Sequence, residues 1–479
     1  MKAKINPKVV VSIVYITAMF MAAMDATIVN VALQTISKEL QVPPSAMGTV
    51  NVGYLVSLAV FLPISGWLGD RFGTKRVFLT ALFVFTTASV LCGIANDITS
   101  LNIFRIMQGA GGGLLTPVGM AMLFRTFSPE ERPKISRFIV LPIAVAPAIG
   151  PIIGGFFVDQ LSWRWAFYIN LPFGIVALLF GLLFLKEHIE KSAGRFDSLG
   201  FVLSAPGFAM LIYALSQGPS KGWASEIIST GIAGVVFITL FIIVELRVKQ
   251  PMLDLRLLKE PVFRKMSLIS LFSSAGLLGT LFVFPLMYQN VIGVSALESG
   301  LTTFPEAIGL MISSQIVPWS YKKLGARKVI SIGLICTAII FVLLSFVNHD
   351  TNPWQIRALL FGIGIFLGQS VGAVQFSAFN NITPPSMGRA TTIFNVQNRL
   401  GSAIGVAVLA SILAGFGNNS VQNNAQSDFL PYQAALIGSA IFLLIALLFS
   451  LRISDKEVMS KKKEKMLSVS KKEKVLVNE

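Results

Sequence analysis

Four ionisable residues lie inside long apolar stretches of the sequence: Asp25, Arg105, Glu306 and Arg399. A charge near the centre of a bilayer costs about 2.5–3.5 kcal/mol, so each of these residues needs a partner, a water-filled cavity or a proton. Two acids and two bases can form structural ion pairs, which is one interpretation. The other is chemical, because a buried carboxyl group can take up a proton from one side of a membrane and release it to the other. We therefore expect Asp25 or Glu306 to carry a proton.

The composition is that of an integral membrane protein. Of the 479 residues, 54% are hydrophobic and 13% are charged, whereas soluble proteins carry about 25% charged residues. The formal net charge of +16 does not indicate a nucleic-acid partner, because the basic residues occupy short loops and a tail, where membrane topology requires them. A basic tail beside a membrane also suits anionic lipid headgroups.

Residues that could bind a metal or a cofactor are few and dispersed. Cys92 and Cys336 each lie inside an apolar stretch, and His188 and His349 are far apart in sequence. No spacing of these residues is typical of a metal site. We expect no metal and no cofactor.

Apolar stretches of about 20 residues, the length that spans a bilayer as a helix, occur fourteen times. The predicted fold is therefore all-α with fourteen transmembrane helices, at residues 9–33, 47–69, 77–95, 101–124, 136–158, 165–186, 199–216, 226–246, 266–290, 297–318, 327–347, 355–377, 391–415 and 431–452. The seventh and eighth stretches are short, so twelve or thirteen spans are the alternative.

The distribution of basic residues predicts the orientation in the membrane. With the N-terminus inside, the inner loops carry most Lys and Arg residues, and the outer loops carry only Lys38, Arg164, Lys221 and Arg357. This asymmetry follows the positive-inside rule. The basic tail also falls inside, which requires an even number of helices. We expect a multi-pass protein of the cell membrane with both termini in the cytoplasm.

The loop between the second and third predicted helices, GWLGDRFGTKR at 66–76, is tight, glycine-rich and basic. Its charges could serve topology alone. Alternatively the loop is a conformational latch, in which Asp70 pairs with a cation or a helix end in one state and releases it in the other. The residues assigned to this latch are Gly66, Asp70, Arg71, Gly73, Lys75 and Arg76.

The same loop recurs later in the chain, as PWSYKKLGARKVI at 318–330. Gly73 corresponds to Gly325, but Asp70 corresponds to Lys322, so a latch built on Asp70 would be one-sided. A second pair of inner loops, at 124–132 and 379–389, is also alike. These repeats predict two six-helix bundles, at 1–190 and 263–452, joined by two additional helices at 191–262 and followed by a basic cytoplasmic tail at 453–479.

Together these motifs resemble the major facilitator superfamily, and within it the fourteen-helix drug:proton antiporter branch. The loop at 66–76 is similar to the superfamily's loop 2–3 signature, and LNIFRIMQGAGGG at 101–113 is similar to its helix-4 motif. APAIGPIIGGFF at 146–157 resembles the helix-5 antiporter motif through Gly150, Pro151, Gly154 and Gly155. MDATIVNVAL at 24–33, QPMLDLRLL at 250–258 and NVQNRLGSAIGVAVL at 395–409 also resemble that branch.

The resemblance implies an exporter of amphipathic drugs that works by alternating access, is coupled to protons and needs no cofactor. It implies that Asp25 and Arg105 are the proton-coupling pair, with Glu306 a further candidate for protonation or for attracting a cationic substrate. The small residues of the helix-5 motif allow close helix packing. We expect a monomer in the bilayer whose substrate cavity is mostly apolar, with a few polar residues: Asn30, Gln34, Gln108, Gln289, Gln315, Asn395 and Arg399.

Two other functions are alternatives to drug export. A transporter of a specific metabolite, lipid or siderophore could use the same scaffold, because fold does not fix substrate. An intramembrane enzyme or a sensor is disfavoured, because the sequence contains no His/Asp/Glu cluster, no Ser–His pair and no soluble domain. The sequence also lacks a phosphate-binding glycine loop, which points to an ion gradient as the energy source.

Overall fold

The computed structural model describes residues 6–42, 47–128, 131, 145–146, 149–150, 152–158, 160–190, 194–417 and 429–453. This part of the chain is helical and contains no strand. Its helices are α1 (Pro7–Glu39), α2 (Gly48–Phe61), α3 (Ser65–Phe72), α4 (Thr74–Ile94), α5 (Ile98–Thr126), α7 (Trp165–Tyr168), α8 (Asn170–Phe184), α9 (Ser198–Gln217), α10 (Ser225–Arg247), α11 (Pro261–Asn290), α12 (Ala296–Leu324), α13 (Ala326–Leu344), α14 (Pro353–Ala378), α15 (Met387–Gly417) and α16 (Leu430–Leu451), with short 3₁₀ turns η2 (Leu255–Lys259) and η3 (Pro384–Ser386).

Several helix starts follow directly from local sequence. The side chains of Asn6, Asp97, Ser295 and Asn352 each accept a hydrogen bond from a backbone N–H group in the first turn of α1, α5, α12 and α14 respectively. These N-cap residues satisfy donors that have no partner within the helix. Proline in the first turn of α1, α11, α14 and α16 is compatible with the helix, since no N–H is needed there.

Within the described residues, eleven helices are long and apolar enough to cross a membrane, or twelve if α2 and α3 together form one span. The chain is a multi-pass membrane protein. The predicted stretch 47–69 is broken, because α2 and α3 meet at an angle of 54°. The predicted stretch 297–318 is helical within α12, but α12 is not among the eleven. The predicted stretch 136–158 lies largely outside the described residues, so the structure does not establish the number fourteen.

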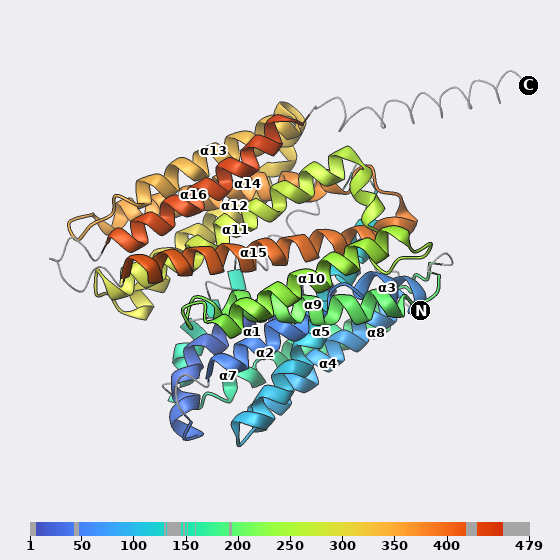
Figure 1. Ribbon diagram of the computed structural model, residues 1–479, viewed down its shortest axis with the longest axis horizontal. Coiled ribbons are helices and arrows are strands. Elements are labelled where there is room, and N and C mark those ends of the chain that lie inside the picture. The colour runs from blue at the N-terminus through green and yellow to red at the C-terminus, as the bar shows by residue number, and fades with distance from the viewer. Residues whose placement is uncertain are drawn as a thin grey trace, which may run out of the picture.

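The helices form two groups that lie beside each other (Figure 1). In the first group α5 packs on α2 and α4, and α8 packs on α1 and α4. In the second group α11 packs on α15 and α16, and α14 packs on α12 and α13. The direct contacts between the groups run from α15 to α3 and α5.

The two additional helices, α9 and α10, form a hairpin that contacts both groups through α9. α9 packs along α10, and it also contacts α2 of the first group and α15 of the second (Figure 1). This hairpin therefore lies across the junction between the two groups.

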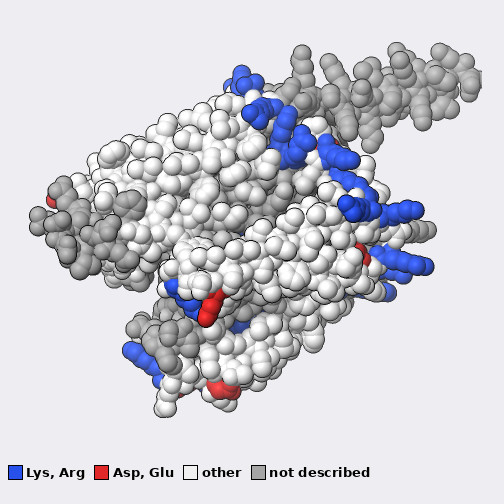
Figure 2. Space-filling view, viewed as in Figure 1, with Lys and Arg blue, Asp and Glu red and all other residues white. Residues whose placement is uncertain are grey.

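Lys and Arg side chains gather mainly at one end of the molecule (Figure 2), the end at which α1 begins in Figure 1. The surface between the two ends is almost free of charge in this view. An uncharged belt of this kind suits the hydrocarbon region of a bilayer, and the basic end suits a membrane–water interface.

Candidate functional site

The Asp25 carboxylate is the centre of a buried hydrogen-bond network. Arg105 Nη1 donates to Asp25 Oδ2 at 2.7 Å, and Gln108 Nε2 and Asn170 Nδ2 each donate to Asp25 Oδ1 at 2.8 Å. The side chains of Arg105 and Asp25 are only 1% and 0% exposed. The two predicted coupling residues are therefore one ion pair, shielded from solvent.

Three helices position this network. Asp25 comes from α1, Arg105 and Gln108 lie one turn apart on α5, and Asn170 is the first residue of α8. Gln108 Oε1 also accepts from Arg105 Nη1 at 2.6 Å, so the two α5 side chains support each other. Asn170 Nδ2 donates a second bond to Ser89 Oγ at 2.8 Å, which connects the network to α4.

Aromatic rings and glycines determine how tightly the network is enclosed. The Arg105 guanidinium lies 4.5 Å from the centre of the Tyr54 ring and 5.8 Å from that of Phe167. A Cβ atom at Gly109 would lie 2.3 Å from the Tyr54 carbonyl oxygen, and one at Gly113 would lie 2.6 Å from that of Leu58. Only glycine lets α2 approach α5 this closely, which places Tyr54 against Arg105.

The network is not fully satisfied. Arg105 Nε and Asn170 Oδ1 are buried without a hydrogen-bond partner in the described part of the chain. Removing one member of a buried ion pair costs about 3–5 kcal/mol, because the other charge is left uncompensated. Protonation of Asp25 would remove its negative charge in the same way. The ion pair and its hydrogen bonds thus depend on Asp25 being ionised, and they connect α1, α5 and α8.

Glu306 and Arg399 do not form a second ion pair. Glu306, on α12, is 6% exposed, and Arg399, on α15, is exposed. Neither makes a hydrogen bond or an ion pair with another described residue. Glu306 is thus a buried acid with no neutralising neighbour in this part of the structure.

Asp70 contacts both groups of helices. Arg125 Nη2 donates to Asp70 Oδ1 at 2.7 Å, and Arg125 Nε reaches the Pro384 carbonyl oxygen at 3.4 Å. A Cβ atom at Gly388 would lie 2.6 Å from Asp70 Oδ1, so the carboxylate packs directly on the first turn of α15. A carboxylate is stabilised at such a helix start by the unpaired N–H groups there.

A second set of contacts lies beside Asp70. The hydroxyl groups of Ser65 and Thr392 are 3.0 Å apart, and Thr391 Oγ1 donates to the Pro117 carbonyl oxygen at 3.1 Å. A Cβ atom at Gly66 would lie 2.7 Å from Thr392 Oγ1. We call these contacts of α3 and α5 with α15 the gate contacts; at this end of the molecule they hold the two groups of helices together.

Gly73, Lys75 and Arg76 of the loop at 66–76 form the turn into α4. Gly73 has φ of +100°, which favours glycine, and its counterpart Gly325 has φ of +84°. Glu187 accepts from the backbone N–H groups of Lys75 at 2.9 Å and Arg76 at 3.2 Å, so it caps α4. Lys75 Nζ donates to the Leu182 carbonyl oxygen at 2.8 Å.

Arg71 has a different environment. It is exposed, and it lines a cavity of about 600 Å³ with residues of α3 and of the segments that flank α9 and α10: Trp67, Phe72, Gly194, Arg195, Phe196 and Gln250.

The segment after α8 closes over this loop. The His188 carbonyl oxygen accepts from the Thr74 N–H at 3.0 Å, and the Glu190 N–H donates to the Asp70 carbonyl oxygen at 2.9 Å. Partial burial, and then the positive charge of Arg125, lower the pKa of His188 below its usual value. This environment favours the neutral imidazole beside the gate contacts.

The glycines of the motif at 146–157 differ in how closely they approach α1. A Cβ atom at Gly150 would lie 2.1 Å from Thr27 Oγ1, and one at Gly154 would lie 2.9 Å from Ile28 Cγ1, so both pack closely on α1. Gly155 has nothing within 4 Å of that position. Pro151 lies outside the described residues.

The residues predicted to line a substrate cavity occupy different environments. Gln108 and Asn395 are buried; Gln108 belongs to the Asp25 network, and Asn395 donates to the Thr391 carbonyl oxygen at 2.8 Å. Asn30 is exposed and accepts from Asn51 Nδ2 at 2.7 Å. Gln289 is half-buried, Gln315 is exposed, and the side chain of Gln34 is outside the described residues.

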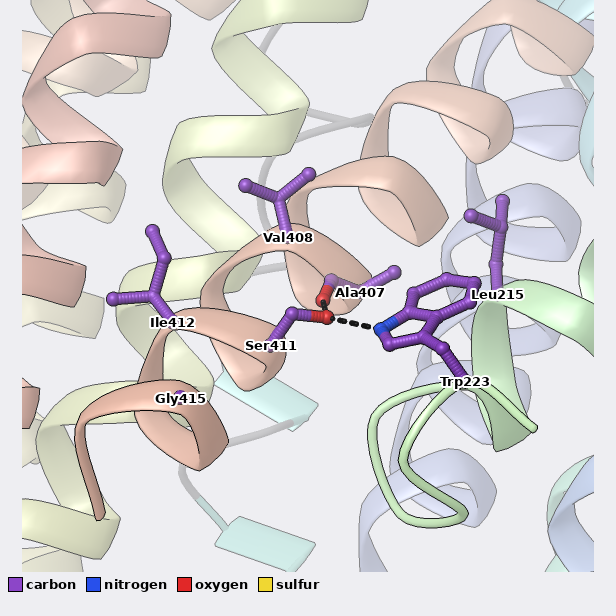
Figure 3. A pocket seen from close by; sticks show the side chains of 7 residues that line it. All are labelled: Leu215, Trp223, Ala407, Val408, Ser411, Ile412 and Gly415. Carbon is purple, nitrogen blue, oxygen red and sulfur yellow. Dashed lines mark hydrogen bonds between the residues drawn. The ribbon is translucent and has the colours of Figure 1, made fainter. Parts of the chain in front are cut away.

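A cavity of about 600 Å³ lies between the turn after α9 and α15 (Figure 3). Trp223 Nε1 donates to Ser411 Oγ at 2.9 Å across it, and the other lining residues are Leu215, Ala407, Val408, Ile412 and Gly415. Neither this cavity nor the one beside Arg71 contains a residue of the predicted substrate cavity.

The family model described as Major Facilitator Superfamily matches residues 15–406 and 324–478. The chain belongs to the major facilitator superfamily. It is 32% identical over 402 residues to an uncharacterized MFS-type transporter YhcA of Bacillus subtilis, covering 84% of this chain and 75% of that one. It is also 32% identical over 424 residues to the multidrug transporter protein MdtP of the same organism, covering 88% and 78%.

A further relative and a solved structure are also named as transport or resistance proteins. A putative multidrug resistance protein MdtD of Pectobacterium atrosepticum is 30% identical over 444 residues, which cover 90% of this chain and 93% of that one. The crystal structure of the human organic anion transporter MFSD10 shares the fold, with a TM-score of 0.66 over 93% of this chain and 100% of that one, at 15% identity. Family and relatives indicate a transporter rather than an enzyme.

Sequence reasoning missed several residues that the structure places in these sites. Asn170 and Tyr54 contact the Asp25–Arg105 pair, and Glu187 caps α4. Gly388 lies against Asp70, and Arg125 donates a hydrogen bond to Asp70. From the sequence, Arg125 was only one of the basic residues of the loop at 124–132. The one available signal was that Asn170 is a polar residue at the start of an apolar stretch.

Proposed function

We propose that this chain is a proton-coupled antiporter that exports amphipathic drugs by alternating access. The observation that carries the proposal is the buried Asp25–Arg105 pair, 2.7 Å apart among α1, α5 and α8. A carboxylate at this position can exchange a proton only at the expense of its ion pair and hydrogen bonds. Proton binding therefore favours a different packing of these helices, which is the requirement for coupling.

The gate contacts supply the second element of such a cycle. Asp70, Arg125, Ser65 and the first turns of α15 join the two groups of helices at the basic end of the molecule. Alternating access requires that contacts of this kind form in one state and break in another. We propose that they close the cytoplasmic side, with both termini in the cytoplasm as the basic residues predict.

We further propose that the complete fold has fourteen transmembrane helices. With α2 and α3 counted as one span, twelve spans lie among the described residues, and α12 and the stretch 136–158 would be the remaining two. The bundles would comprise residues 1–190 and 263–452, with 191–262 as the two additional helices and 453–479 as the tail. A monomer in the cell membrane would contain both halves of the transport pathway.

Drugs are the favoured substrates because relatives with about 30% identity bear multidrug names. A dispersed set of polar residues in an apolar surrounding suits loose binding of bulky amphipathic molecules.

The test is dye efflux in everted membrane vesicles from cells whose own drug pumps are deleted. An imposed pH gradient should drive dye accumulation, and collapse of the gradient should stop it. Asp25→Asn should abolish gradient-driven transport while still allowing dye to exchange down its own gradient. Transport that is equally fast without any pH gradient would contradict proton coupling. Failure with every dye and antibiotic, but not with a metabolite panel, would favour a specific transporter.

A further inference from the structure

A second pair of acids lies in the two additional helices. Glu245 is in the last turns of α10 and is 0% exposed, and Asp197 precedes α9 and is 8% exposed. Neither belongs to the Asp25 network or to the gate contacts. Such complete burial of a carboxyl group is rare unless it is paired.

One oxygen of each acid is satisfied by a backbone donor. Glu245 Oε2 accepts from the Leu253 N–H at 3.3 Å, and Asp197 Oδ1 accepts from the Gly200 N–H at 2.8 Å. The other two oxygens, Glu245 Oε1 and Asp197 Oδ2, are buried and have no partner in the described part of the chain.

The two unpartnered oxygens converge on one point. A Cβ atom at Gly200 would lie 2.7 Å from Asp197 Oδ2 and 2.8 Å from Glu245 Oε1. Glycine at position 200 therefore leaves the space in which the two carboxyl groups face each other. Two buried, ionised carboxylates in this arrangement would repel each other, and each would keep an unsatisfied oxygen.

The charged groups around the pair do not remove this conflict. Asp254, in the segment after α10, adds a further negative charge, and Arg389 is the cation that acts on Glu245 from α15. Arg389 Nη1 lies 4.0 Å from Asp254 Oδ2, so Asp254 is its partner among these acids. Among the residues that the structure describes, no group of three or more His, Cys, Asp or Glu residues could hold a metal ion.

We propose that Asp197 and Glu245 share one proton and form a second buried proton-binding site, built by the two additional helices and separate from Asp25. The proton comes from water, and the resulting O–H of one carboxyl group donates to the free oxygen of the other. This single proton removes one negative charge and satisfies both orphaned oxygens. The site lies between the start of α9 and the end of α10, near Asp254, which Arg389 approaches from the first turn of α15.

The proposal is tested on the purified full-length protein in detergent, without any transport measurement. Alkaline pH removes the shared proton and leaves two adjacent charges, so the wild-type protein should lose thermal stability as pH rises. Glu245→Gln keeps a donor at every pH and should reduce this loss. We expect the wild type to lose about 2–4 °C more in Tm than the variant between about pH 6 and pH 9.

Asp197→Asn is the reciprocal variant, since its amide can donate to Glu245 while its oxygen still caps Gly200. Either substitution alone should reduce the alkaline loss of Tm by the same amount, which distinguishes a shared proton from two independent acids. Glu226→Gln, an exposed glutamate at the start of α10, is the matched control and should behave as the wild type. If all four proteins lose Tm in parallel, the shared proton is ruled out.

Infrared difference spectra between the two pH values provide a second readout that does not depend on Tm. The wild type should show the carbonyl stretch of a protonated carboxyl group that disappears at alkaline pH. Glu245→Gln and Asp197→Asn should each lack that component, whereas Asp25→Asn should keep it. A spectrum unchanged by both substitutions would overturn the proposal, and this outcome is independent of whether the chain exports drugs.

Discussion

At the scale of single residues, the Asp25–Arg105 pair is the most constrained feature of this chain. The carboxylate accepts three hydrogen bonds, and the guanidinium lies against two aromatic rings. A buried pair of this kind contributes little net stability, but breaking it is costly. Under the proposed function its role is conformational, since a change in the charge of Asp25 would alter the packing of the three helices that meet there.

We predict that Asp25→Asn lowers the free energy of unfolding by about 3–5 kcal/mol, because Arg105 is left as an uncompensated buried charge. Adding Arg105→Gln should recover most of that loss, since no net charge remains in the network. Neither protein should couple transport to a pH gradient. Tm measurements and vesicle assays would separate the two effects. If the double variant were less stable than Asp25→Asn, the pair would not be the source of the loss.

His188 gives a pH-dependent prediction outside the membrane-spanning helices. Burial and Arg125 lower its pKa, so the fold favours neutral imidazole. The unfolded chain binds the proton more readily, so the contribution to stability is lost as pH falls below the usual value of about 6.5. Protonation would place a second positive charge near Arg125 and loosen the segment at 187–190.

The measurement is amide hydrogen exchange at Thr74 and Glu190, whose N–H groups donate across this contact. After correction for intrinsic exchange, protection should fall between about pH 7 and pH 5 in the wild type and remain constant in His188→Gln. His349→Gln, which alters a histidine packed on Phe429, is the control. Equal acid sensitivity in the wild type and His188→Gln would assign the effect to other groups.

At the scale of elements, glycine decides how closely helices approach. The helix-5 motif looks uniform in the sequence, yet Gly150 and Gly154 contact α1 and Gly155 does not. The contact with Thr27 and Ile28 lies only a few residues along α1 from Asp25. The motif therefore packs on the part of α1 that carries Asp25.

We predict that Gly150→Ala destabilises the protein by about 1–3 kcal/mol, because the added methyl group overlaps Thr27. Gly155→Ala should be neutral or slightly stabilising, since alanine is the better helix former and its methyl group meets open space. Tm values of the two variants form a matched comparison. A larger loss of Tm for Gly155→Ala than for Gly150→Ala would show that the segment at 146–157 faces α1 differently.

At the scale of the whole molecule, the repeated loops at 66–78 and 318–330 are related but not equivalent. Gly73 and Gly325 occupy the same kind of turn with positive φ. The position of Asp70 is Lys322 in the second half, and Lys322 is exposed, whereas Asp70 is buried against Arg125 and α15. The gate contacts described here are thus built from one copy of the repeated loop.

Asp70→Asn should shift the equilibrium between closed and open gate by about 1.5–3 kcal/mol, roughly tenfold or more, because a buried charged hydrogen bond is lost. Lys322→Gln should change transport by less than about twofold, as expected for a surface charge. Dye efflux and spin-label distances across the gate would measure both variants. Equal effects of the two substitutions would mean that the charges of the loop at 66–76 serve membrane topology alone.

Composition and hydrophobic length alone determined the membrane class and most helix positions, because the bilayer requires long apolar segments and expels charge from them. The same argument identified Asp25, Arg105 and Glu306 as unusual. The family resemblance came from motifs such as the loop at 66–76. The sequence could not show that Asp25 and Arg105, which are 80 residues apart in the chain, bond to each other; that pair was an implication of the resemblance, with Glu306 a further candidate for protonation. Only tertiary packing placed the Arg105 guanidinium on Asp25, put Asn170 and Tyr54 beside them, and brought Asp197 and Glu245 together around Gly200.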